Sequence, residues 1–249
     1  MGHTINHTKT TLIKIPVKNQ KINPSRDITA IFSSKSWSGR RCFVLGGGLS
    51  FEGFDFSKIQ NELTIGVNKS FINFLTTINY AMDTRFYDSV SSAGKTPDSI
   101  ELQEHWKNYK GIKIFLRRDK KFRFDSSIIT VNSLPNKVLS LDLSKGIWGG
   151  NNSAFGALML SIALGCKTIG LLGCDFYIDK ERKKTHWHSG YKNQDIKSFP
   201  RKLESFKKCF EEFAFCIEKQ GIKVVNLSEK SRLNHFSKMT LDEFLALPV

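Results

Sequence analysis

Several classes of protein are disfavoured by what this 249-residue sequence lacks. No apolar run approaches the roughly 20 residues that span a bilayer, and no apolar stretch typical of a signal peptide stands near Met1. The five cysteines are scattered and form no Cys-x-x-Cys pair, which argues against a disulfide framework and against a cysteine metal site. We therefore expect a reduced, cytoplasmic protein without a transmembrane segment.

Acidic residues are scarce relative to basic ones. The chain has 38 Lys and Arg against 23 Asp and Glu, a formal net charge of +15. Such an excess favours a polyanionic partner, such as nucleic acid, an anionic lipid surface or an anionic glycan. Basic residues are frequent in the first 40 positions, where Asp27 is the one acid. We expect residues 1–40 to form a basic, partly disordered N-terminal arm, and residues 41–249 to form a single catalytic domain.

Residues 41–249 alternate between short apolar runs and segments with helical periodicity. The expected strands are 42–45, 63–67, 78–82, 113–116, 168–172 and 222–226, and a further strand is expected over 10–17 in the N-terminal arm. The segments 128–131 and 138–141 are either short strands or an irregular insertion. The expected helices are 84–90, 97–109, 154–164, 195–220 and 241–245. This repeated order of strand, loop and helix predicts an α/β, Rossmann-like, doubly wound and mostly parallel sheet with helices on both faces.

The stretch 146–191 is the densest in chemically useful groups. Asn152 and Ser153 precede an apolar run and are typical of a helix N-terminus, and the strand 168–172 follows that helix. Directly after the strand come Asp175, Tyr177, His186, His188 and Tyr191. Ligands of open α/β sheets bind beyond the carboxyl ends of the strands. The alternative is an ordinary surface loop, but the density of the cluster favours a functional site.

Two other strand ends predict contacts with a nucleotide. Gly46, Gly47 and Gly48 follow the first strand, and such a turn lets backbone N–H groups approach a phosphate or sugar. The turn, which continues to Ser50, matches neither Gly-x-Gly-x-x-Gly nor a P-loop, so a tight turn without a ligand is the alternative. Asn68 follows the second strand, where an amide either bonds a base or ribose or caps the next helix.

Basic loops are candidates for contact with nucleic acid. After the strand 113–116 the chain carries basic residues next to the aromatic Phe122, and more lie in the polar loop near residue 183. Phosphate and base contacts use this combination, although a solvated loop would show it too. The candidates are Arg117, Arg118, Lys120, Lys121, Arg123, Lys183 and Lys184.

From Arg41 to Phe236 the order of these segments resembles glycosyltransferase family 42, the bacterial sialyltransferase-like enzymes. It also resembles the Rossmann-like group that includes archaeal 6-hydroxymethylpterin diphosphokinase. Most of the resemblance lies in the block 152–177, from the helix start through Ala-Leu-Gly to the strand ending in Gly-Cys-Asp-Phe-Tyr. The His-Trp-His sequence before 192–196 is similar to the family's histidine-rich loop. The chain departs from the family at Gly46 or Gly47, where the family has asparagine, and at Gly190, where its catalytic histidine falls.

This resemblance implies a transferase that moves a sugar from a nucleotide-sugar donor, with a CMP-sugar favoured, to a hydroxyl group. His188, with His186 as the second candidate, would remove the hydroxyl proton. Tyr177, Tyr191 and the helix start at Ser153 would hold the departing phosphate. The remaining nucleotide contacts would come from Gly46, Gly47, Gly48, Ser50, Asn68, Asn152 and Asp175. We expect no cofactor and no metal to be required.

The excess of positive charge suggests DNA as the acceptor. A hydroxymethylated base would be flipped out of the duplex and glycosylated, as in a bacteriophage DNA-modifying enzyme that works in the host cytoplasm. One alternative is a glycosyltransferase acting on a lipid or surface glycan. Another is an ATP- and magnesium-dependent enzyme like the pterin diphosphokinases, with Asp83, Asp88 and Asp175 as metal ligands. A nucleic-acid-binding module without enzymatic activity is a third.

Overall fold

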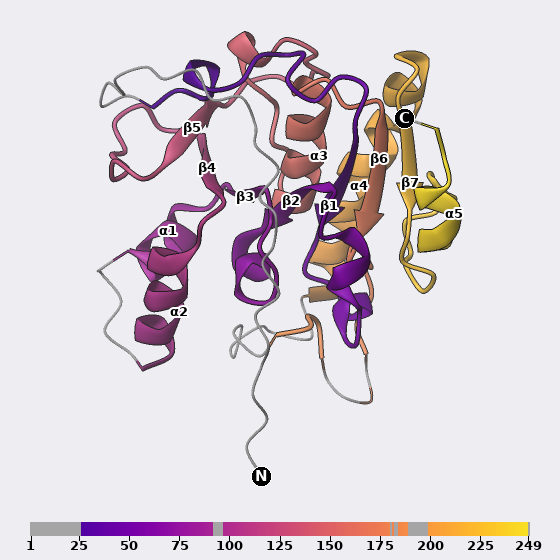
Figure 1. The fold of residues 1–249 in the computed structure, drawn as a ribbon, viewed down its shortest axis with the longest axis horizontal. Coiled ribbons are helices and arrows are strands. Elements are labelled where there is room, and N and C mark those ends of the chain that lie inside the picture. The colour runs from indigo at the N-terminus through magenta and orange to yellow at the C-terminus, as the bar shows by residue number, and fades with distance from the viewer. Residues whose placement is uncertain (1–25, 92–96, 180, 182–183, 189–198, 249) are drawn as a thin grey trace.

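The computed structural model describes residues 26–91, 97–179, 181, 184–188 and 199–248, which form an eight-stranded parallel sheet (Figure 1). The strands are β1 (Arg41–Leu45), β2 (Leu63–Val67), β3 (Ile78–Ala81), β4 (Ile112–Arg117), β5 (Ile129–Asn132), β6 (Thr168–Leu172), β7 (Lys223–Asn226) and β8 (Ser237–Lys238). They are ordered β5-β4-β3-β2-β1-β6-β7-β8, and every ladder between neighbours is parallel.

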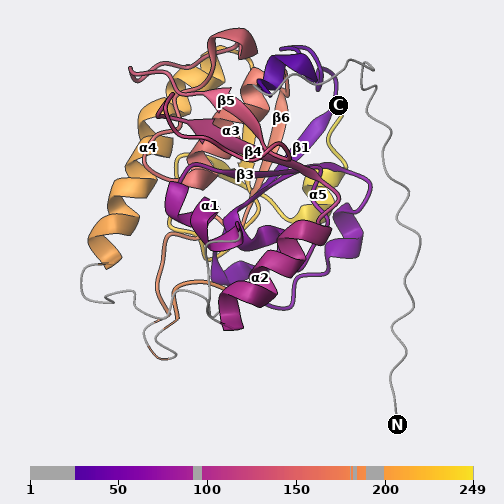
Figure 2. The same cartoon turned by 90° about the vertical axis from the view of Figure 1, so that its left-hand side faces the viewer.

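Helices cover both faces of the sheet, as Figure 2 shows from the side. They are α1 (Thr84–Val90), α2 (Pro97–Asn108), α3 (Ser153–Ala163), α4 (Phe199–Lys219) and α5 (Leu241–Leu245). The core residues of α3 and α4 belong to one hydrophobic cluster, whereas those of α1, α2 and α5 belong to two clusters on the opposite face. The predicted Rossmann-like, doubly wound architecture is confirmed.

Strand β1 shows why the sheet needs helices on both sides. Its side chains alternate between the faces, so that Cys42 and Val44 join the α3 side while Phe43 and Leu45 join the α5 side. All four are fully buried. A strand covered on both faces is apolar at every position, which is the run visible in the sequence.

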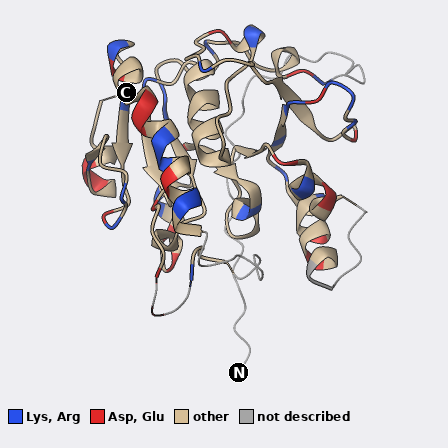
Figure 3. Cartoon of the chain, turned by 180° about the vertical axis from the view of Figure 1, so that it is seen from behind, with Lys and Arg blue, Asp and Glu red and all other residues tan. Residues whose placement is uncertain are grey.

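Helix α4 is amphipathic, and this pattern places it at the surface. Phe210, Phe213 and Ile217 turn into the core. Lysine and glutamate alternate along the outer side, where Lys207 lies 2.8 Å from Glu204 in an ion pair (Figure 3). Much of the basic character of this helix is therefore balanced by its own acidic residues.

The chain order reverses between β1 and β6. From β1 the chain builds outward to β5, then returns through α3 to β6 on the other side of β1 and continues to β8. The loops that leave the carboxyl ends of β1 and β6 consequently run in opposite directions along the sheet. In doubly wound folds this switch point opens the crevice in which ligands bind.

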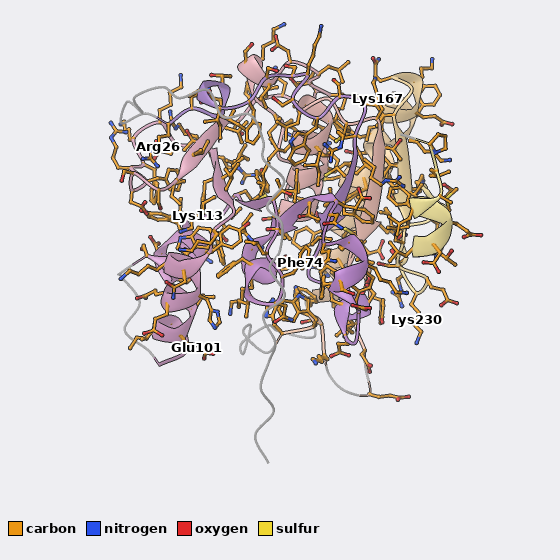
Figure 4. The ribbon with its side chains drawn as sticks, viewed as in Figure 1. Arg26, Phe74, Glu101, Lys113, Lys167 and Lys230 are labelled. Carbon is orange, nitrogen blue, oxygen red and sulfur yellow. The ribbon has the colours of Figure 1, made fainter. Side chains whose placement is uncertain are left out.

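The part of the predicted N-terminal arm from Arg26 onward packs into the domain. Ile28, Phe32 and Trp37 are at most 5% exposed and belong to the same core cluster as α3. The Arg26 carbonyl accepts a hydrogen bond of 2.8 Å from the backbone N–H of Thr130, and Figure 4 shows Arg26 beside β5. Sparse apolar anchors in a polar, basic segment produce no periodic pattern, so sequence reasoning missed them. The expected strand over 10–17 lies outside the described residues.

The segment 138–141 forms no strand. Val138 and Leu141 are 43% and 42% exposed, and the chain between them is irregular. This outcome matches the second of the two alternatives that the sequence left for this segment.

Candidate functional site

A cavity of 720 Å³ lies at the switch point and extends along the carboxyl ends of the strands from β6 to β4. Turns that follow five strands contribute to its wall, together with the N-terminal residues of α3 and α4. Its size suits a nucleotide or a nucleotide sugar. Ten of the predicted site residues line it, namely Gly47, Gly48, Asn68, Arg118, Asn152, Ser153, Asp175, Tyr177, His186 and His188.

The glycine turn after β1 is pressed against the turn after β6. The N–H of Gly46 donates to the Leu172 carbonyl at 2.7 Å, and that of Gly48 donates to the Gly173 carbonyl at 2.8 Å. A Cβ atom at Gly46 would lie 2.3 Å from the Gly173 oxygen. Close packing of the two turns therefore explains Gly46, which does not line the cavity, whereas Gly47 and Gly48 line it.

Asp175 holds the same turn in place through hydrogen bonds to Ser50. It is 3% exposed, and its two carboxylate oxygens accept from the backbone N–H and the hydroxyl of Ser50, both at 2.7 Å. The Ser50 hydroxyl also lies 3.0 Å from that of Ser228, which accepts from the Gly173 N–H. Asp175 and Ser50, both predicted to contact a nucleotide, thus have a structural role in holding the glycine turn.

The N-terminus of α3 opens into the cavity beside Asn68. The Asn152 side chain caps this helix by accepting from the Phe155 N–H at 2.9 Å. Asn68 adopts a left-handed conformation with φ of 50°, and its side-chain oxygen lies 3.4 Å from the Ser153 hydroxyl. First-turn N–H groups of a helix lack intrahelical partners and carry a partial positive charge. This part of the wall can therefore bind an anion.

Arg118 adds a full positive charge next to that helix start. Its Nη2 donates to the Gly150 carbonyl at 2.6 Å, two residues before the helix cap. The guanidinium has further N–H groups beyond this bond. A phosphate at this place would meet both Arg118 and the first turn of α3.

Two more cations line the cavity. Arg85 and Lys202 are exposed, and within the part of the chain that the structure describes the side chain of neither forms a hydrogen bond or an ion pair. The carboxylates of Asp83 and Asp119 each accept from a backbone N–H, that of Arg85 at 2.9 Å and that of Lys121 at 2.7 Å. The cavity is lined by as many cationic as anionic side chains. The cationic side chains have more N–H groups without a hydrogen-bond acceptor, and this favours an anionic ligand.

His186 and His188 stack against each other near the glycine turn, with ring centroids 5.4 Å apart. Burial lowers the pKa of His186 to about 4. Burial, together with the charges of His186, Lys69 and Lys184, lowers the pKa of His188 to about 3. Both imidazoles are therefore neutral at pH 7 and able to accept a proton, as weak bases.

Tyr177 lines the same cavity as the two histidines. The Thr185 hydroxyl lies 2.8 Å from Nδ1 of His186 and helps to fix that ring. Tyr191, the second predicted tyrosine, lies outside the described residues, as does Gly190.

The basic loop after β4 divides into a residue at the cavity and residues on the surface. Arg118 belongs to the cavity wall, whereas Lys120, Lys121 and Arg123 are exposed and Arg117 is half-buried at the end of β4. In the second basic loop Lys184 forms an ion pair with Glu52, and Lys183 lies outside the described residues. Of the basic residues predicted from the sequence, those next to the cavity are thus the ones that follow β4.

The three carboxylates considered as magnesium ligands have separate places. Asp83 caps α1, Asp88 lies on the exposed side of that helix, and Asp175 binds Ser50. Among the residues described by the structure, no group of three His, Cys, Asp or Glu side chains is arranged to hold a metal ion. No helix in the described segments is long and apolar enough to cross a membrane.

Sequence reasoning missed part of the cavity wall. Arg85, Phe124 and Lys202 line the cavity although they share no motif. The available signal was topological, because residues that follow neighbouring parallel strands meet at one edge of the sheet. The aromatic residues after β4 and the polar residues after β3 could have been grouped on that ground.

No protein-family model and no curated protein matches the chain, so the resemblance to family 42 and to the pterin diphosphokinases stays a prediction. Among solved structures the chain is similar to the MAf glycosyltransferase from Magnetospirillum magneticum AMB-1, with a TM-score of 0.48 and 10% sequence identity. The match covers 84% of this chain and 34% of that one, so the chain spans about a third of its length. A likeness this distant says nothing of substrate or reaction, so function has to come from the cavity itself.

Proposed function

We propose that the protein is a nucleotide-sugar-dependent glycosyltransferase. The observation that carries this proposal is a single switch-point cavity in which an anion-binding wall, made by Arg118 and the start of α3, lies along the same space as two neutral histidines. The phosphate of a sugar nucleotide would bind the anion-binding wall. The hydroxyl proton of the acceptor would be taken up by one of the two neutral histidines.

The chemistry follows from this arrangement. His188, with His186 as the second candidate, takes the acceptor hydroxyl proton while the acceptor oxygen forms a bond to the anomeric carbon. The bond from that carbon to the phosphate oxygen breaks, and its electron pair stays on the phosphate. Arg118, Tyr177 and the N–H groups at Ser153 stabilise the developing negative charge. Asn68, Asn152 and the Gly47–Gly48 backbone hold the rest of the nucleotide, and Tyr191 is a further candidate for the phosphate.

The proposal extends to the two substrates. A CMP-sugar is the favoured donor because of the family resemblance, and a hydroxymethylated base in DNA is the favoured acceptor. The exposed Lys120, Lys121 and Arg123, which follow Arg118 on the same loop, support a polyanionic acceptor. Affinity for duplex DNA should then fall steeply between low and physiological salt. A lipid or surface glycan is the alternative acceptor, and it is favoured if no DNA is bound at low salt.

A thermal-shift screen of CMP, UDP, GDP and ATP tests the donor class, with and without magnesium. We expect stabilisation by a nucleotide in the presence of EDTA. Arg118→Gln should weaken nucleotide binding by about 10-fold to 100-fold, because a charge-assisted hydrogen bond is worth about 1.5–3 kcal/mol. Lys121→Gln removes an equal charge from the exposed part of the same loop and serves as the matched control. Equal effects of the two substitutions, or binding only with magnesium, would contradict the proposed arrangement.

The histidines are tested separately. His188→Ala should abolish turnover while leaving nucleotide affinity within a few fold of wild type, because the imidazole acts on the acceptor. Unchanged turnover in a folded His188→Ala variant would rule out His188 as the base and would move that role to His186.

A further inference from the structure

An aromatic wall forms the end of the cavity nearest β4. Phe122 and Phe124 line the cavity with ring centroids 4.8 Å apart. Tyr87 of α1 packs edge-on against both, at 5.7 and 4.9 Å, and the buried Phe115 lies 5.1 Å from Phe124. These contacts fix the rings in place, so that a flat ligand ring would meet a surface that is already ordered.

The polar groups at this end differ from those at the histidine end. Asp83 and Asp119 line the cavity together with Arg85. In each carboxylate one oxygen accepts from a backbone N–H, and the other accepts no hydrogen bond from the residues that the structure describes. Hydrogen-bond acceptors and hydrogen-bond donors therefore both lie beside an aromatic surface. The edge of a nucleobase presents the complementary donors and acceptors around a flat ring.

The length of the cavity separates this end from the reacting groups. Three strand spacings lie between β1 and β4, which amounts to about 14 Å across the sheet. The histidines are at the β1 side, since a Cβ atom at Gly47 would lie 3.1 Å from Cδ2 of His186. The start of α3 lies between the two ends, because the Ser153 hydroxyl contacts Asn68 after β2, and the Arg118 side chain reaches toward this helix start from the loop after β4. A nucleotide whose phosphate binds there places its base and its anomeric carbon at opposite ends.

We propose that the β3–β4 end of the cavity is the subsite for the base of the donor nucleotide. The base stacks on Phe122, and its edge is read by Asp83, Asp119 and Arg85. This inference rests on the proposed function, and it adds the residues that determine which nucleotide is used. The reacting hydroxyl of the acceptor then lies at the opposite end of the cavity, beside His188 and Tyr177.

The test compares nucleoside monophosphates with ribose 5-phosphate, which has the same sugar and phosphate but no base. In calorimetric titrations Phe122→Leu should weaken binding of the preferred nucleotide by roughly 10-fold or more, since stacking of one base is worth about 1–3 kcal/mol. The affinity for ribose 5-phosphate should stay unchanged. Phe122→Tyr should keep the wild-type affinity for both, because it keeps the stacking surface.

Two outcomes overturn the inference in different ways. If Phe122→Leu binds the nucleotide as tightly as wild type, the base lies elsewhere while the proposed function stands. If neither nucleotides nor ribose 5-phosphate bind the wild-type protein, the proposed function fails as well. Should Phe122→Leu not fold, Asp83→Asn provides the second test, because asparagine also caps α1 well. It should change the ratio of affinities for CMP and UMP, and an unchanged ratio counts against the subsite.

Discussion

The hydrogen bonds between Asp175 and Ser50, which hold the glycine turn in place, give the sharpest prediction for stability. Asp175 is 3% exposed and accepts two hydrogen bonds of 2.7 Å from Ser50. A hydrogen bond to a charged group contributes about 1.5–3 kcal/mol, and removing one partner leaves a buried donor unsatisfied. Asp175→Ala removes both acceptors at once, although the Ser50 hydroxyl keeps its contact with Ser228. We expect a loss of about 3 kcal/mol in the free energy of unfolding.

Urea unfolding followed by circular dichroism measures this loss, and thermal unfolding should show a fall of about 6–12 °C for a chain of this size. Asp175→Asn keeps one acceptor and should lose about half as much. Ser50→Ala removes only the hydroxyl and should be the mildest of the three. In a double-mutant cycle the Asp175 and Ser50 substitutions should be strongly non-additive, because they share these bonds.

The opposite result would refute the reasoning. If Asp175→Asn unfolds like the wild type but no longer binds a nucleotide, the carboxylate contacts the ligand. Asp175 would then return to the role that the sequence suggested for it. A loss of stability together with a proportionate loss of nucleotide binding would instead support a structural role for Asp175.

Two further predictions concern the same turn and the histidine loop. The pKa values of His186 and His188, about 4 and about 3, lie below the ordinary value of 6.5, so the unfolded chain binds more protons between pH 6.5 and about 4. Stability should therefore fall as the pH is lowered through this window, by about 2 kcal/mol from pH 6.5 to 4.5 for His186 alone. Urea unfolding at both pH values should show a flatter dependence in a variant with both histidines changed to glutamine, and an unchanged slope would contradict their burial as neutral groups. Gly48→Ala should cost about 1–3 kcal/mol, because the new Cβ would lie 2.4 Å from an Asp175 oxygen and 2.7 Å from the Gly173 carbonyl. Gly47→Ala meets only a His186 ring carbon at 3.1 Å and should cost clearly less in thermal melts, so equal losses would show that packing does not distinguish the two positions.

The sheet could be predicted well because burial on two faces leaves a strong pattern. The expected bounds of β2 and β6 match the structure, since both strands are apolar or small throughout and are followed by glycine or asparagine. The bounds of α1 and α5 match as well, because Asp83 and Thr240 mark their starts as capping residues. The bounds of each of these elements are determined by residues within it or directly next to it.

The site could be predicted only in part, because its wall is assembled from five separate strand ends. The histidines and the start of α3 were found because they cluster along the chain near β6. Phe122, Arg85 and Lys202 come from distant segments and line one cavity only because of the fold. The hydrogen bonds of Asp175 to Ser50 were also hidden, since a carboxylate that binds a ligand and one that binds a buried serine have the same sequence pattern.

The contact between Gly46 and Gly173 has a consequence for how this turn can vary between related proteins. With only 2.3 Å between a Cβ atom at Gly46 and the Gly173 oxygen, no residue other than glycine is accommodated there without separating β1 from β6. Any larger side chain at Gly46 would therefore require a matching change in the turn after β6, and the two positions should change in concert.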